Sequence, residues 1–222
     1  HFTRAALFFN PTSRQAFEIG SYYLHTAAYD IHKAKEYYEK AYALDPNLPR
    51  LNYQLARVSF LQSDFYTART YVSREIELYP DFPRSWYIRG LIEGYSGNYD
   101  AAITDFKTFI EKVPSEWAGY NDLAWIYFKR GDYANVKRYA QQGLLLKPDN
   151  VWLLTTLGAS LINLGERKQA ADVLGKALAL ANLLTPARWT AAYPANDPHL
   201  AVVGLAQIRA TIQRNLDLVV DK

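Results

Sequence analysis

The sequence of 222 residues contains no cysteine and no methionine. Without cysteine, the chain cannot form disulfide bonds, bind zinc or an iron–sulfur cluster through thiolates, or use a thiol as a nucleophile. Methionine is missing even at the first position, which is His1, so we expect that a segment once preceded this residue. That expectation favours an exported or membrane-tethered protein, with a cytoplasmic protein as the alternative.

Long apolar runs and strong net charge are also missing. The apolar run near the N-terminus covers only residues 5–9, whereas a membrane-spanning helix needs about 20 apolar residues. The net charge is +3, and lysine and arginine are interspersed with aspartate and glutamate. We therefore expect no membrane span and no nucleic-acid binding through phosphate contacts, and stacking of RNA bases on aromatic residues is a distant alternative.

The histidines and carboxylates show no pattern that a catalytic or metal site requires. The four histidines lack the helical spacing and the neighbouring glutamate of a zinc hydrolase: His1, His25, His32 and His199. The chain also has no glycine-rich loop after a strand that could hold phosphate. Glu75 and Glu77 are expected to lie on a solvated helix surface. The sequence thus predicts no enzyme activity, no metal and no cofactor.

What the sequence does contain is a repeat of 34 residues. Prolines recur at this interval at Pro46, Pro80, Pro114 and Pro148. Residues that can cap a helix N-terminus follow the same interval at Asp30, Asp64, Asn98 and Asp132. The apolar residues between these markers follow helical spacing, and half of all residues are hydrophobic, as in a folded protein. Each repeat therefore begins a new helix at its cap, and no strand is expected.

Glycines and other small residues keep the same phase. Gly97, Gly131 and Gly165 stand one residue before a cap, where a helix often ends in a left-handed conformation. Ser63 and Tyr29 occupy that position in two other repeats. Two further sets of small residues are Ala56, Gly90, Ala124 and Gly158, and Ala34, Ala68, Ala102 and Ala170. These sets predict closely packed helix pairs.

The pattern resembles the tetratricopeptide repeat (TPR), a two-helix hairpin with an aromatic residue, two small residues around a turn, and a closing proline. The third repeat carries it in Trp86, Gly90, Gly97, Asn98, Tyr99, Ala102, Phe106 and Pro114. The fourth carries it in Tyr120, Leu123, Ala124, Tyr127, Gly131, Tyr133 and Pro148. The resemblance implies an all-α fold, a right-handed α-solenoid of about five TPR-like helical hairpins with a C-terminal capping helix.

The repeat divides the chain into three parts. These are an apolar N-terminal tail at 1–11, a TPR solenoid at 12–184, and an irregular loop with a capping helix at 185–222. The five repeats are expected at 15–48, 49–82, 83–116, 117–150 and 151–184. In the first repeat, Gly20 lies two residues too early relative to Ala34, so its loop or its register must differ.

The C-terminal part departs from the repeat. Pro186 and Pro194 predict an irregular loop over 183–196, because proline interrupts a continuous helix. A last helix is expected to follow, with Asn196 or Asp197 as cap and Pro198 in its first turn. Its apolar face consists of Leu205, Ile208, Ile212, Leu216 and Val219.

The resemblance also implies that the first helix of each hairpin faces a concave groove that binds peptides. The residues predicted to line it are Tyr23, Arg50, Tyr53, Arg57, Arg84, Tyr87, Asn121, Trp125 and Trp152. Aromatic rings supply contact area and arginine pairs bidentately with carboxylates, so we expect an acidic or C-terminal peptide of a partner protein. For each single residue, the alternative is core packing or plain solvation.

A second hypothesis is structural and concerns the N-terminal tail. Its apolar residues have no repeat to join: Phe2, Ala5, Leu7, Phe8 and Phe9. We favour folding of this tail onto its own first hairpin, and the alternative is docking on a neighbouring copy. In the second case the chain would be a self-assembling subunit of a surface or membrane-associated complex.

Overall fold

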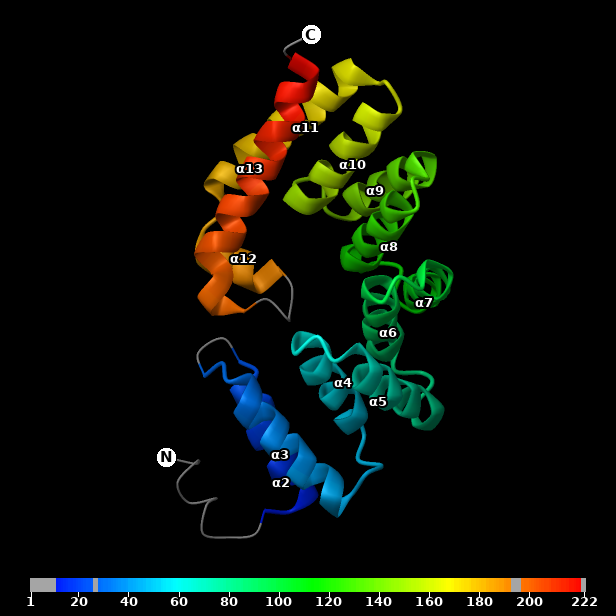
Figure 1. Ribbon diagram of the computed structural model, residues 1–222, viewed down its shortest axis with the longest axis vertical. Helices are drawn as coiled ribbons and strands as arrows, with labels where there is room; N and C mark the ends of the chain where they lie inside the picture. The colour runs from blue at the N-terminus through cyan, green and yellow to red at the C-terminus, as the bar shows by residue number, and fades with distance from the viewer. Residues whose placement is uncertain (1–10, 26–27, 193–196, 221–222) are drawn as a thin grey trace. The chain divides into compact units, whose positions relative to one another are not determined.

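A computed structural model describes residues 11–25, 28–192 and 197–220, and the N-terminal tail at 1–10 lies outside these ranges. The chain divides into two compact units, 1–97 and 98–222 (Figure 1), which are described separately. The described residues contain helices and no strand, which confirms the predicted all-α fold of TPR-like hairpins. Among these residues no helix combines the length and the apolarity that crossing a membrane requires.

The first unit contains five described helices. They are α2 (Ser13–Tyr23), α3 (Ile31–Leu44), α4 (Leu51–Leu61), α5 (Phe65–Leu78) and α6 (Pro83–Tyr95). Helices α2 and α3 pack as one pair and α4 and α5 as the next, and α6 packs against α5. The dark-blue and cyan pairs in Figure 1 are thus two successive hairpins.

The second unit begins with α7, so the division falls inside the predicted repeat 83–116. Its helices are α7 (Tyr99–Lys112), α8 (Trp117–Lys129), α9 (Tyr133–Leu146), α10 (Val151–Asn163), α11 (Arg167–Leu183), α12 (Pro186–Ala192), the 3₁₀ helix η1 (Pro198–Leu200) and α13 (Ala201–Val220). Helices α8 and α9 pair, α10 and α11 pair, and α13 packs along α11.

The helix starts follow the predicted caps. Asp30, Asp64 and Asp132 each accept a hydrogen bond from the backbone N–H three residues on, at 3.0–3.1 Å. This bond satisfies one of the N–H groups that a helix start leaves without an intrahelical partner. Asn98 also occupies the N-cap of α7, although its side chain makes no cap hydrogen bond.

The turns inside the hairpins show the expected left-handed residues. Gly97, Gly131 and Gly165 have φ of +82°, +75° and +76°. Ser63 takes the same conformation at φ +61°, where a side chain is less easily accommodated than in glycine. The repeat therefore imposes one backbone geometry at this position whether or not glycine supplies it.

The first hairpin differs from the others in its loop, as the early Gly20 predicts. Helix α2 ends at Tyr23 and α3 begins at Ile31, whereas α4 ends at Leu61 and α5 begins only four residues later. The Tyr38 ring lies against Gly20, where an added Cβ would come within 2.8 Å of it. The longer loop thus accompanies close packing of the Tyr38 ring on Gly20.

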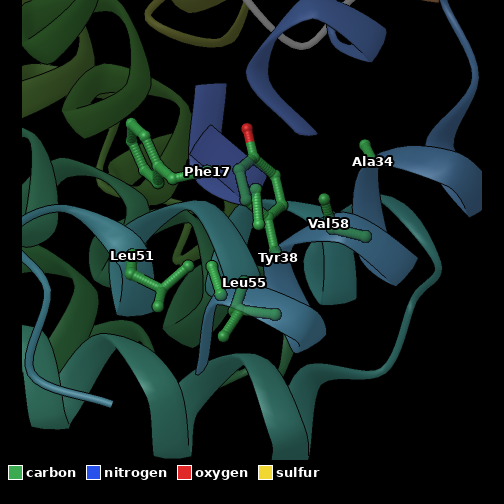
Figure 2. Packing of buried hydrophobic residues seen from close by; sticks show 8 residues of the cluster. Phe17, Ala34, Tyr38, Leu51, Leu55 and Val58 are labelled. Carbon is green, nitrogen blue, oxygen red and sulfur yellow. The ribbon is translucent and has the colours of Figure 1, made fainter. Parts of the chain in front are cut away.

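The core of the first unit is a cluster between the first two hairpins. Phe17 from α2, Tyr38 from α3 and Leu55 from α4 are buried together with Ala34, Leu51 and Val58 (Figure 2). The Phe17 and Tyr38 rings lie 5.7 Å apart, and the Tyr38 hydroxyl donates to Ser21 Oγ at 3.1 Å. Burial raises the pKa of Tyr38 to about 12.

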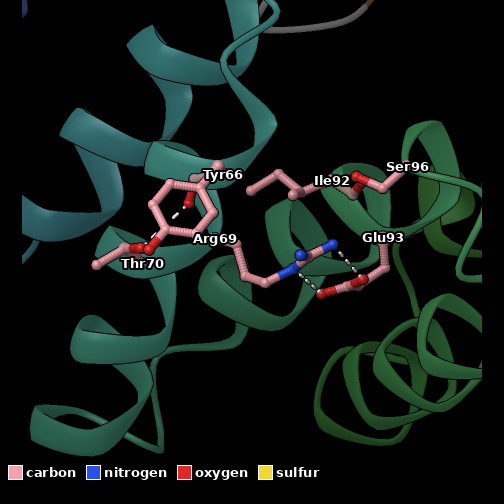
Figure 3. A network of polar contacts seen from close by, with 6 residues as sticks. All are labelled: Tyr66, Arg69, Thr70, Ile92, Glu93 and Ser96. Carbon is pink, nitrogen blue, oxygen red and sulfur yellow. Dashed lines mark hydrogen bonds and ion pairs between the residues drawn. The ribbon is translucent and has the colours of Figure 1, made fainter.

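A polar contact joins α5 to α6 in the same unit. Arg69 Nε and Nη2 donate to the two carboxylate oxygens of Glu93 at 2.6 and 2.8 Å (Figure 3). The Glu93 side chain is only 9% exposed, whereas Arg69 is 37% exposed. A bidentate pair of this kind fixes the relative position of two helices as well as their charge balance.

The second unit, like the first unit at Gly20, packs large side chains directly on glycines. An added Cβ at Gly119, Gly143 or Gly158 would lie 2.5–2.7 Å from the side chain of a residue on a neighbouring helix. For Gly158, the neighbour is the fully buried Leu174 of α11. These positions therefore require glycine because of close packing, not because of their backbone conformation.

The C-terminal part contains one helix that the prolines did not predict. The expected irregular loop at 183–196 is wrong for 186–192, because Pro186 begins α12. Proline is compatible with the first turn of a helix, where its missing N–H has no intrahelical acceptor to lose. The ring of Trp189 in α12 then packs on Gly204 of α13, where a Cβ would lie 2.1 Å from it.

The capping helix itself is confirmed. Asp197 accepts a hydrogen bond from the His199 N–H at 2.8 Å, and Pro198 begins η1, so α13 proper starts at Ala201. On the predicted apolar face of this helix, Leu205 and Ile212 are buried. The other predicted members of that face, Ile208, Leu216 and Val219, are half-buried.

Candidate partner-binding surfaces

Four residues from the first helices of two successive hairpins form what we call the tyrosine–arginine patch. Arg50, Tyr53 and Arg57 belong to α4 or its N-cap, and Phe82 is the N-cap residue of α6. The Tyr53 and Phe82 rings meet edge to face at 5.1 Å. The Arg57 guanidinium carbon lies 5.7 Å from the Tyr53 ring centre, and that of Arg50 lies 6.0 Å from the Phe82 ring centre. Two cations are therefore held beside two aromatic rings.

The start of α4 is held in an unusual way. Arg50 is the N-cap residue with φ +69°, and its side chain makes no cap hydrogen bond. Instead, the carboxylate of Glu75 in α5 accepts two backbone hydrogen bonds. Its Oε1 accepts one from the Arg50 N–H at 2.8 Å, and its Oε2 accepts one from the Tyr53 N–H at 3.2 Å. A side chain of the second helix of the hairpin thus caps the first helix.

Glu75 is fully buried, so the expectation that it lies on a solvated surface is wrong. Burial raises the pKa of this carboxyl above its ordinary value, because the charged form loses hydration. The N–H groups of Arg50 and Tyr53 act in the opposite direction by stabilising the carboxylate. Because Glu75 already occupies the N-terminal end of α4, an acidic partner group at this patch must be met by the guanidinium groups.

The other predicted groove residues of the first unit differ in exposure. Tyr23 is half-buried and stacks on Tyr37 at 6.0 Å, and Lys33 Nζ lies 5.3 Å from its ring. Arg84 is half-buried in the first turn of α6. Tyr87 is only 7% exposed, so it belongs mainly to the interior of its unit.

In the second unit, the predicted residues flank a tryptophan pair. Trp152 of α10 and Trp117 of α8 have nearly parallel rings, 28° apart, with centres separated by 6.4 Å. Lys147 Nζ lies 4.9 Å from the Trp117 ring. Trp125 is half-buried, and Asn121 is 7% exposed and donates from Nδ2 to Asp122 Oδ1 at 3.0 Å. Asn121 is therefore mostly an interior residue.

Sequence reasoning missed four residues that shape these surfaces. Phe82, Trp117 and Lys147 lie at or beside helix ends, outside the helical stripe from which the groove residues were inferred. Glu75 was assigned to the surface because it is charged. Its place eleven residues into α5 coincides with the buried Ala41 of α3, and this periodic match is the signal that could have found it.

Family models of the tetratricopeptide repeat match residues 18–48 and 87–135. These two segments of the chain therefore carry tetratricopeptide repeats. The matches cover parts of the first, third and fourth predicted repeats, and the helices of the structure extend the hairpin pattern to the second and fifth repeats. No curated protein sequence matches this TPR chain.

Solved structures resemble the TPR fold described above. A crystal structure of MamA protein is 19% identical, covers 78% of this chain and 94% of its own, and has a TM-score of 0.67. MamA 41-end from Desulfovibrio magneticus RS-1 is 18% identical, covers 77% of this chain and 95% of its own, and has a TM-score of 0.68. YrrB, a TPR protein with an unusual peptide-binding site, is 13% identical, covers 81% of this chain and 91% of its own, and has a TM-score of 0.63. At these identities the likeness shows the fold alone.

Proposed function

We propose that this TPR protein is a non-catalytic interaction module or scaffold that binds an acidic peptide segment of a partner protein, internal or C-terminal. The observation that carries the proposal is the tyrosine–arginine patch, in which two guanidinium groups stand beside two aromatic rings. The peptide-binding site named for YrrB supports a peptide as the class of ligand.

The chemistry of the patch fits such a ligand. Arginine offers a planar set of donors that can pair bidentately with a carboxylate, and aromatic rings offer flat apolar area to neighbouring side chains of the peptide. Arg57 also donates to Gln54 Oε1 at 2.7 Å, so its guanidinium is partly oriented before a partner arrives. Preorganised side chains lose less conformational entropy on binding.

The other predicted residues contribute unequally to the proposal. Tyr23, Arg84, Trp125 and Trp152 are half-buried and retain area for contact, with Arg84 as an additional steering charge. Tyr87 and Asn121 offer little area at 7% exposure each. In the second unit, the stacked rings of Trp117 and Trp152 would supply an apolar contact for a separate segment of the partner.

A charge-reversal variant tests the proposed function. The wild-type protein is incubated with an array of synthetic peptides that range from acidic to basic, and bound protein is measured for each. We expect selection of acidic peptides that contain aromatic residues, and loss of that selection in Arg57→Glu. Arg74→Glu is the matched control, because Arg74 is 47% exposed on α5 and pairs with Glu77. Equal binding by Arg57→Glu and wild type would contradict the proposal.

The alternative function is self-assembly, in which the apolar N-terminal tail docks on a neighbouring copy within a surface or membrane-associated complex. One observation favours it: α13 leaves Val202, Val203 and Leu218 at 69%, 53% and 56% exposure, although terminal helices of repeat proteins usually present a polar outer face. Light scattering of the protein with and without residues 1–9 tests it. A polymer that falls to monomer on truncation supports self-assembly, and a monomer in both cases contradicts it.

A further inference from the structure

We propose that Glu75 is a positioning residue for the tyrosine–arginine patch, because its buried carboxylate sets the first turn of α4 and thereby places Arg50 and Tyr53 for the partner. The inference rests on the proposed function, since it concerns the same patch. It adds a residue that makes no contact with the partner and on which the partner's affinity nevertheless depends.

The contacts are specific to the residues that carry the patch. Oε1 of Glu75 holds the Arg50 N–H at 2.8 Å and Oε2 holds the Tyr53 N–H at 3.2 Å. Arg50 has φ +69°, a conformation that a residue with a Cβ adopts only when its surroundings impose it. This backbone conformation directs the Arg50 side chain toward the Phe82 ring, 6.0 Å away.

The repeat shows that the hairpin itself does not require a carboxylate here. The corresponding positions of the first and fifth hairpins are Ala41 and Ala177, and both are fully buried. The first helices of those hairpins are capped by their own residues, Thr12 for α2 and Asn150 for α10. A local cap and an alanine would therefore satisfy a TPR hairpin at this point.

Placing a carboxylate at a fully buried position is unfavourable unless it gains specific bonds. The bonds that Glu75 gains all go to the turn of α4 that begins with Arg50 and includes Tyr53. The repeat does not need this arrangement, and the arrangement holds the turn that carries Arg50 and Tyr53, as expected of a residue that serves the patch. Glu75 differs from the caps Asp30, Asp64 and Asp132, because those residues recur with the repeat and Glu75 does not.

The experiment compares Glu75→Ala with Asp64→Ala. Both changes remove a carboxylate cap from the same α4–α5 hairpin, but Asp64 caps α5 and leaves the first turn of α4 intact. The probe is a fluorescein-labelled synthetic peptide containing aspartate, glutamate and phenylalanine, and binding is followed by fluorescence anisotropy. Amide hydrogen exchange of residues 50–54, read by mass spectrometry without peptide, reports on the turn itself.

We expect Glu75→Ala to speed exchange at the Arg50 and Tyr53 amides and to weaken peptide binding by about tenfold. Asp64→Ala should speed exchange at the start of α5 and leave peptide affinity within about twofold of wild type. Glu75→Gln retains one acceptor oxygen and should recover part of the affinity. This partial recovery would distinguish positioning from general loss of stability.

Three results would overturn the inference. If Glu75→Ala leaves exchange at 50–54 unchanged, the carboxylate does not hold the turn. If exchange rises but peptide affinity stays at the wild-type value while Arg57→Glu loses it, the proposed function stands and Glu75 does not position the patch. If wild type binds no acidic peptide, the proposed function fails and the role of Glu75 in binding fails with it, while the exchange result still decides whether Glu75 caps α4.

Discussion

The two units differ in the contacts that supplement the apolar packing between their successive hairpins. In the first unit polar contacts add to the apolar clusters: Lys35 Nζ of α3 donates to Gln62 Oε1 at 3.3 Å, and Arg69 of α5 pairs with Glu93 of α6. In the second unit side chains pack on glycines of the next or preceding helix, although Lys137 and Glu166 add an ion pair at 2.6 Å. Ion pairs and close packing on glycine thus both contribute to the contacts between successive hairpins.

The largest effect should come from overfilling an apolar joint. Gly143→Val places branched carbons where Leu153 of the next hairpin now lies, 2.7 Å from the position of an added Cβ. We expect a loss of about 2–3 kcal/mol in the free energy of unfolding, measured by urea denaturation. Gly175→Ala in α11 is the control, because no atom lies within 4 Å of its added Cβ. It should gain about 0.5–1 kcal/mol, and a Gly143→Val protein as stable as wild type would refute close packing at this joint.

Breaking a polar joint should cost less. Glu93→Ala leaves the Arg69 guanidinium without its bidentate acceptor, and because Arg69 is 37% exposed, water compensates part of the loss. We expect the free energy of unfolding, measured by urea denaturation, to fall by about 1–2 kcal/mol. Combining it with Arg69→Met should restore part of the stability, since neither charge of this ion pair then remains. Glu77→Ala, at a 66% exposed residue, should change stability by less than about 0.5 kcal/mol.

A smaller effect is expected at a feature that both units share. Asp132→Ala removes the side-chain acceptor of the Asn135 N–H at the start of α9 and should cost about 1 kcal/mol in thermal or urea unfolding. Asp132→Asn keeps an acceptor oxygen and should lose clearly less. Equal losses for the two variants would mean that the charge of Asp132, and not its hydrogen bond, stabilises the helix start.

The smallest effect concerns pH and Glu75. Burial raises the pKa of Glu75 above its ordinary value of 4.5, so folding favours the protonated carboxyl. Its contribution to stability is therefore greatest below pH 4.5 and falls as pH rises through the raised folded-state pKa. Urea unfolding at a series of pH values should show wild type losing stability relative to Glu75→Gln over this window. A difference independent of pH would contradict a raised pKa.

Much of the fold could be predicted because the repeat signals are local. The caps Asp30, Asp64 and Asp132 bond to backbone groups three residues away, so their role depends only on neighbouring sequence. The helix α12 was missed because Pro186 is compatible both with a helix start and with a loop, and only tertiary packing decides between them. Ser63 shows the reverse case, in which the repeat imposes a turn without its usual residue.

The candidate site was less predictable because it depends on contacts between helices. The helical stripe brought together Arg50, Tyr53 and Arg57, which do share the patch with Phe82. The same rule placed Tyr87 and Asn121 in the groove, although each is 7% exposed, because spacing along one helix does not show how deeply its neighbours cover it. Glu75 could not be assigned by charge alone, since its hydrogen-bond partners lie more than twenty residues away.

The contact of Trp189 with Gly204 is expected to slow degradation of the protein. Together with Arg209, whose guanidinium donates to the carbonyls of Ala181 and Leu184 at 3.0 Å, this ring fastens α13 over the last hairpin. Loss of either anchor would release the helix and bare the apolar residues beneath it to proteases and chaperones. We therefore expect variants that lose the Trp189 or the Arg209 contact to be degraded faster than wild type, although both residues lie far along the sequence from the patch proposed to meet the partner.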